Sequence, residues 1–139
     1  MFFRKKSAGS APDRDQVGTR QIASSLLSAS GVDFDRADGL PQALIGTFLF
    51  GMLHAYAMDA KLSAPRARAL MTAAFEDVLH YAPEAAREAV QQCIDATRPG
   101  VHDTMNAVMH RGIDGYRQYI QADADGLAEN IRSILERFA

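Results

Sequence analysis

Two stripes of opposite polarity run along and just beyond residues 104–119, where apolar and polar side chains each recur every three or four positions. The apolar stripe consists of Met105, Val108, Met109, Gly112, Ile113, Tyr116, Tyr119 and Ile120. The polar stripe consists of Asp103, Asn106, His110, Asp114, Arg117 and Gln121. Because spacings of three and four place side chains on one face of an α-helix, the pattern predicts an amphipathic helix. One face packs into a core, and the other presents an imidazole, a carboxylate and a guanidinium to solvent.

Five further helices are predicted by apolar periodicity combined with residues that begin or end helices. Asp13 or Asp15 caps the first, which runs to about Ala29 and is ended by Gly31. Pro41 opens the second, which is apolar almost all round, runs to about Lys61 and fits the centre of a bundle. The remaining starts are Ser63 for the third helix, Pro83 for the fourth, which runs to about Thr97, and Asp123 for the sixth.

The fold class predicted from these patterns is all-α. Sustained alternation of β-branched and polar residues, which indicates strands, is almost absent. The chain has 139 residues, enough for one domain with a buried core. We expect a compact single-domain bundle of five to six antiparallel helices over residues 13–139. A disordered basic lead is expected at residues 1–12.

Charge is distributed unevenly along the chain. Residues 1–20 hold five basic and two acidic side chains and so carry +3; since the total is −2, the remainder carries −5. An acidic body argues against nucleic acid, whose phosphates need a basic face. It suits a protein partner with a basic surface, because complementary charge speeds and orders docking. An oligomer is possible through the edge that carries Tyr116 and Tyr119, but the pattern does not indicate one.

The sequence favours a cytoplasmic protein that neither enters nor crosses a membrane. Cys93 is the only cysteine, so no internal disulfide can form. The opening residues MFFRKK are followed by small and polar residues, without the apolar region of an ordinary secretory signal. The apolar run at residues 43–53 is well short of the roughly 20 residues that span a bilayer. It is interpreted as part of a buried helix.

The groups that could support catalysis or bind a metal form no complete set. His110 and Asp114 lie four residues apart and could act as an acid–base couple or, with His54 and His80, as metal ligands. No HExxH or repeated ExxH motif supports that alternative. Cys93 is interpreted as a small core residue, and no nucleophile elbow or glycine-rich phosphate loop is present. We expect no catalytic residue, no cofactor and no metal.

Acidic side chains gather at two places outside the amphipathic helix. Asp33, Asp35 and Asp38 lie in a turn-rich loop that lacks the glycine at position 6 and the glutamate at position 12 of an EF-hand. We interpret it as a solvated loop that caps helices and whose charge steers a basic partner. Glu76 and Asp77 are neighbours on the third helix, point in different directions and form a second acidic patch.

Gly112 and Gly115 are unusual inside a helix, because each costs about 1 kcal/mol relative to alanine. Close approach of two helices is one explanation, and room for a partner's side chain is the other. Gly115 lies nearer the polar stripe and is assigned to a contact. Arg111 and Tyr116 flank that stripe and are residue types enriched at binding hot spots, although a solvated arginine and a half-buried tyrosine are the simpler alternatives.

Several segments resemble the immunity protein 48 family. They are LHAYA at 53–57, LSAP at 62–65, VLHYAPE at 78–84 and, most specifically, MNAVMHRGIDG at 105–115. The similarity covers about residues 40–137. The family consists of small all-helical bacterial proteins of polymorphic toxin systems, so the resemblance implies a cytoplasmic antidote that binds a cognate toxin. It carries no catalytic motif to transfer, and Asn106, His110, Arg111 and Asp114 fall within its distinctive segment.

The sequence therefore predicts function by binding, with a metal-dependent bundle enzyme and a helical adaptor as the alternatives. The residues assigned to the partner come from the amphipathic helix and from the two acidic patches. They are Asn106, His110, Arg111, Asp114, Gly115, Arg117, Asp33, Asp35, Asp38, Glu76 and Asp77.

Overall fold

The computed structural model describes residues 13–138 and consists of six α-helices and one short 3₁₀ turn. The elements are α1 (Arg14–Ser30), η1 (Phe34–Arg36), α2 (Gly39–Asp59), α3 (Ala64–Asp77), α4 (Pro83–Ala96), α5 (Asp103–Ile120) and α6 (Ala124–Phe138). No strand occurs between residues 13 and 138. The all-α prediction is confirmed. The lead predicted at residues 1–12 lies outside the described residues.

Local capping chemistry explains where several helices begin. The Asp13 carboxylate accepts the backbone N–H of Asp15 at 2.8 Å, and Ser63 Oγ accepts that of Arg66 at 3.3 Å. Asp123 Oδ1 accepts the N–H of Gly126 at 2.9 Å at the start of α6. These bonds satisfy backbone donors that the first helical turn leaves free. All three predicted caps are confirmed, with Asp13 rather than Asp15 as the first.

The second helix differs slightly from the prediction at both ends. It begins at Gly39, two residues before Pro41, because proline fits any position of the first turn, where no N–H is needed. It ends at Asp59, and Lys61 follows with φ of 57° in the turn to α3. At the end of α1, Gly31 adopts φ of 70°, a left-handed conformation that favours glycine, as predicted.

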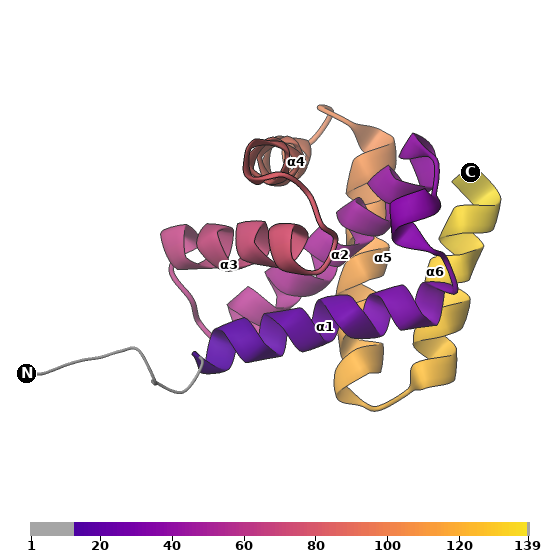
Figure 1. Ribbon diagram of the computed structural model, residues 1–139, viewed down its shortest axis with the longest axis horizontal. Coiled ribbons are helices and arrows are strands. Elements are labelled where there is room, and N and C mark those ends of the chain that lie inside the picture. The colour runs from indigo at the N-terminus through magenta and orange to yellow at the C-terminus, as the bar shows by residue number, and fades with distance from the viewer. Residues whose placement is uncertain (1–12, 139) are drawn as a thin grey trace, which may run out of the picture.

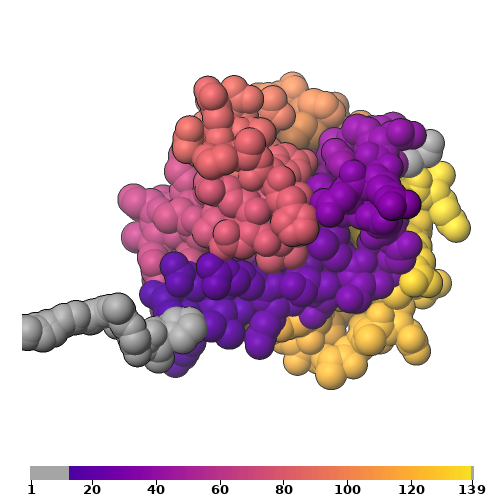
Figure 2. Space-filling view, in the orientation of Figure 1, coloured from indigo at the N-terminus to yellow at the C-terminus, as the bar shows by residue number. Residues whose placement is uncertain are grey.

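α2 lies at the centre of the molecule and packs most extensively against α5 (Figure 1). It is apolar nearly all round, so Phe48, Leu49 and Met52 are fully buried. α5 and α6 form an antiparallel pair on one side of α2, and α3 and α4 lie on the other (Figure 1). Figure 2 shows that α1, the loop after it, α3 and α4 together make up one face of the molecule.

Glycines let the backbones of α2 and α5 touch. A Cβ on Gly112 would lie 2.2 Å from the Phe48 carbonyl oxygen, and a Cβ on Gly51 would lie 2.1 Å from that of Met109. Gly115 is also buried, and a Cβ there would lie 2.7 Å from the Phe48 ring. Close packing, one of the two explanations considered for Gly112 and Gly115, therefore accounts for both glycines.

Candidate partner-binding site

The outer face of α5 presents three exposed polar side chains. His110, Asp114 and Arg117 lie on this face, and Arg117 Nη1 donates to Asp114 Oδ1 at 2.9 Å. His110 Nδ1 lies 2.9 Å from the Asn106 carbonyl oxygen, which can only accept, so Nδ1 carries a proton. The other ring nitrogen, His110 Nε2, takes no part in this bond. Val108 and Tyr116 on the opposite side of the helix are buried, so the predicted division into a core face and a polar face is confirmed. The exception is Ile120, which was assigned to the core face but is exposed at the last residue of the helix.

Two predicted binding residues on α5 hold neighbouring helices. Asn106 Nδ2 donates to the Ala96 carbonyl at 3.1 Å, which joins α5 to the end of α4. Arg111 Nε donates to Asn130 Oδ1 at 2.8 Å, and its Nη2 donates to Ser133 Oγ at 2.8 Å. Asn130 Nδ2 in turn donates to the Arg111 carbonyl at 3.0 Å. Arg111 and Asn130 therefore fasten α5 to α6, and a partner contact at Arg111 or Asn106 remains a prediction.

Gly115 lies on the core side of α5, between Phe48 and Leu127. A partner's side chain has no access to a position buried between α2, α5 and α6. Gly115 is therefore not part of the exposed face of α5, and packing explains why it has no side chain.

The loop between α1 and α2 carries the first group of exposed acidic side chains. Phe34 is buried and anchors the loop, while Asp33, Asp35 and Asp38 point away from the core and are exposed. His80 Nδ1 lies 3.1 Å from Asp35 Oδ1, which links this loop to the one between α3 and α4. Asp33 and Asp38 occupy N-cap positions, but neither side chain makes a capping bond, so their expected capping role is wrong.

The second acidic group lies at the end of α3. Glu76 is half-buried, and Asp77 is exposed. Arg20 on α1 donates to Asp77 Oδ2 from Nε at 3.1 Å and from Nη2 at 2.7 Å. His80 is three residues after Asp77 and contacts Asp35 of the first acidic group. The two acidic groups therefore lie near each other at the loop after α3. Within residues 13–138, no hydrogen bond or ion pair joins them to the outer face of α5.

The three histidines considered as metal ligands do not converge. His54 stacks on Phe50 with ring centroids 6.2 Å apart, whereas His80 contacts Asp35 and His110 contacts a backbone carbonyl. In the described part of the chain, no three His, Cys, Asp or Glu side chains lie close enough to hold a metal ion. Burial raises the pKa of the Cys93 thiol to about 12, which keeps it protonated and unreactive. The geometry gives the metal-enzyme alternative no support.

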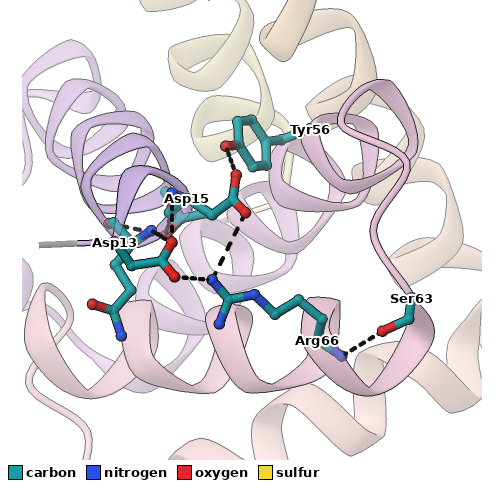
Figure 3. A network of polar contacts seen from close by, with 7 residues as sticks. Asp13, Asp15, Tyr56, Ser63 and Arg66 are labelled. Carbon is teal, nitrogen blue, oxygen red and sulfur yellow. Dashed lines mark hydrogen bonds and ion pairs between the residues drawn. The ribbon is translucent and has the colours of Figure 1, made fainter.

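A polar network beneath the N-terminus of α1 was not foreseen from the sequence (Figure 3). Arg66 on α3 pairs with Asp13, and its Nη2 lies 3.7 Å from Asp15 Oδ2. The Tyr56 hydroxyl donates to Asp15 Oδ1 at 2.5 Å, which brings α2 into the same network. Because the partners are about 40 to 50 residues apart, no local sequence signal indicates these contacts. The network joins the start of α1 to α2 and α3.

A second tyrosine–carboxylate pair lies next to this network. Tyr116 on α5 donates to Asp59 Oδ2 at 2.8 Å, and its ring meets that of Tyr56 edge-on with centroids 6.4 Å apart. Burial, followed by the hydrogen bond to a carboxylate, raises the pKa of each tyrosine to about 12. Tyr116 is buried, more deeply than the half-buried position considered for it. Both phenols remain neutral donors and act as ties between helices.

These observations define an all-helical bundle that presents an exposed polar helix face and acidic loops on a tightly packed core. A family model described as Immunity protein 48 matches residues 19–139, and the chain belongs to this family. The resemblance of residues 40–137 is thereby confirmed and extends to most of the chain. Neither the curated proteins nor the solved structures contain a match. In residues 13–138, no helix is both long enough and apolar enough to cross a membrane.

Proposed function

We propose that this protein binds a cognate bacterial toxin and neutralises it by covering the toxin's working surface. The single observation that carries the proposal is the family match over residues 19–139. The inhibitor acts in the cytoplasm of the producing cell, in stoichiometric amounts and without a chemical step. The low reactivity of the buried Cys93 thiol and the separation of the three histidines are consistent with action by binding.

The outer face of α5 is the proposed anchor. His110, Asp114 and Arg117 stand on a helix whose other side is packed against α2. Arg111 and Asn106 hold that helix to α6 and α4. A face fixed in this way loses little conformational entropy when it docks, which favours tight binding. A few such central residues dominate the affinity of many protein interfaces.

The acidic groups are proposed to guide the toxin to this face. Asp33, Asp35 and Asp38 are exposed, and the described residues as a whole hold seventeen acidic and twelve basic side chains, a net charge of −5. A toxin with a basic surface would be attracted over a Debye length of roughly 8–10 Å before contact. Glu76 and Asp77 add to the same field from the end of α3.

A matched pair of variants tests the proposal. Asp114→Ala with Arg117→Ala removes an exposed ion pair three residues apart on α5, and Asp95→Ala with Arg98→Ala removes a pair of the same spacing between the end of α4 and the turn after it. Both double variants leave the net charge unchanged. Binding to the toxin encoded next to this protein's gene should weaken about tenfold or more for the α5 variant only. Equal affinities for both variants and the native protein would contradict the assignment of the α5 face.

The metal-dependent alternative is tested separately by elemental analysis of the protein as purified. We expect no stoichiometric transition metal. One equivalent of bound zinc, iron or manganese that is lost when His110 is replaced would contradict the proposed function.

A further inference from the structure

A large groove lies on the side of the molecule away from α6. It has a volume of about 1110 Å³ and is bordered by the second half of α2, the first half of α3 and one side of α4. Leu62 and Ile94 contribute accessible apolar surface to its lining, and the buried Phe50 and Met71 lie at its base. Met58 also lines it and is 68% exposed, so the groove is open to solvent rather than enclosed. None of the residues proposed above as toxin contacts lines it.

The charge of the groove is opposite to that of the rest of the molecule. Lys61, Arg68 and Arg87 line it, and no aspartate or glutamate does, whereas residues 13–138 as a whole carry −5. In residues 13–138 these three cations make no ion pair, although several other arginines do. Arg68 Nη1 donates to the neutral Gln91 Oε1 at 2.7 Å, and the nearby Asp95 is engaged by Gln91 and Arg98. The groove therefore offers uncompensated positive charge beside apolar surface.

We propose that this groove binds an amphipathic helical segment of a partner protein, with its apolar side on Met58, Leu62 and Ile94 and with carboxylates facing the cations. Laying an apolar helix face into a hydrophobic groove is a common mode of peptide recognition. Methionine side chains are flexible and adapt to such a face. Pockets for small molecules usually hold about 300–1000 Å³ and enclose most of the ligand. This larger and open groove fits a segment of chain better.

The charge that the segment must carry follows from the cations that line the groove. Carboxylates on the segment would give Lys61, Arg68 and Arg87 partners that the described chain does not supply. A basic segment would be repelled, because like charges brought together at an interface oppose binding. The inference goes beyond the proposed function, since this occupant is acidic and the steering loops attract a basic surface.

The test uses two fluorescent peptides and the full chain, so it needs no toxin. Each peptide has 18 residues and a leucine stripe at helical spacing, flanked by glutamates in one and by lysines in the other. Fluorescence anisotropy at low salt should show at least tenfold tighter binding of the glutamate peptide. That preference should shrink as salt rises, because exposed charges are screened. Equal affinities, or a preference for the lysine peptide, would overturn the proposal.

Variants locate the binding and separate it from general charge effects. Lys61→Glu with Arg87→Glu should reverse the preference between the peptides, and Met58→Ser should weaken both peptides severalfold. The control, Arg14→Glu with Arg137→Glu, makes the same charge change at exposed residues that do not line the groove. It should keep a preference for the glutamate peptide. Because all these positions are exposed, folding is expected to persist and is checked by circular dichroism.

Two further outcomes count against the proposal. Groove variants that bind the glutamate peptide as the control does would place its site elsewhere. Dimerisation in analytical ultracentrifugation that is lost with Lys61→Glu and Arg87→Glu would show that a second copy of the chain fills the groove. Neither result bears on toxin binding by α5, which is measured in a separate experiment.

Discussion

Gly112 sets how closely α5 approaches α2, because the carbonyl oxygen of Phe48 occupies the space where a side chain would begin. Backbone atoms inside two packed helices have little freedom to shift. The polar face of α5 thus depends on a glycine on the opposite side of the same helix. A glycine in mid-helix normally lowers stability. At this position the loss of helix propensity is the cost of direct contact between the two backbones.

Replacing Gly112 by alanine should lower the free energy of unfolding by about 1–3 kcal/mol, since overpacking outweighs the gain of about 1 kcal/mol in helix propensity. Urea denaturation measures the change. Gly39→Ala is the control, because nothing lies within 4 Å of the position that an added Cβ would take and its φ is not left-handed. Gly39→Ala should leave stability unchanged or raise it slightly. A Gly112→Ala protein as stable as the native one would refute the packing explanation.

Asn130 is buried, and its hydrogen bonds fix the position of the Arg111 side chain. It accepts from the Arg111 guanidinium, donates to the Arg111 carbonyl and also donates to Gln118 Oε1 at 3.0 Å. Asn130→Ala should cost about 1–3 kcal/mol, because several polar groups lose their partners inside the bundle. Thermal unfolding measures this loss against the exposed Ser24→Ala control. A cost no greater than that of Ser24→Ala would show that Arg111 does not brace α6.

At the scale of the helices, two tyrosine–carboxylate pairs join α1, α2 and α5, and they make stability depend on pH. The pKa values of Tyr56 and Tyr116 rise from 10.0 to about 12 on folding, which means that the folded state holds each phenolic proton more tightly. Their contribution to stability is therefore complete below pH 10 and is lost as the pH rises from 10 to about 12.

Urea denaturation between pH 9 and pH 11 should show native stability falling with pH. Cys93 contributes to the same fall, because its pKa is also raised, from 9.0 to about 12. Tyr56→Phe should flatten the part of the slope above pH 10, and Tyr116→Phe should do the same, whereas Cys93→Ala should act from pH 9 upward. An alkaline slope unaffected by either tyrosine substitution would mean that the phenols are not held by their carboxylates.

The helices were predictable where the controlling residues are neighbours in sequence. Asp13, Ser63 and Asp123 act on N–H groups within three residues, so their capping bonds followed from the sequence. The contacts of Arg111 with Asn130 and of Tyr56 with Asp15 join separate helices and depend on how these helices cross. Such crossings follow from the packing of whole helix faces, which the sequence does not specify locally.

The candidate surfaces were likewise predictable only where the spacing of neighbouring residues decides exposure. The exposure of His110, Asp114 and Arg117 followed from helical spacing, whereas the burial of Gly115 depended on which way α5 is turned. The cationic groove was missed, although one signal was present. Residues 60–75 contain Lys61, Arg66 and Arg68 and no acidic residue in an otherwise acidic chain. Only the fold shows that Arg66 turns toward Asp13 while Lys61 and Arg68 line the groove.

For the whole molecule, the net charge of −5 over residues 13–138 should govern the rate of encounter with the toxin. Asp33→Asn, Asp35→Asn and Asp38→Asn together should slow association several-fold at low salt and barely change dissociation, because steering acts before contact. Stopped-flow fluorescence measures both rates. The difference should vanish at high salt.

The control for this experiment makes the same charge change on α6. Asp125→Asn, Glu129→Gln and Glu136→Gln also remove three negative charges at exposed positions. This variant should slow association less than the loop variant does. If both variants slow association equally, only the total charge matters and the loop has no particular role.

The most direct test of inhibition by occlusion is a titration of the toxin's own activity with the purified protein. Activity should fall in proportion to added protein and reach zero at a fixed whole-number ratio. The toxin should regain full activity after the complex is denatured and the two chains are separated and refolded. A small fraction of one equivalent that progressively destroys the toxin's activity, or its release in a chemically altered form, would contradict the account.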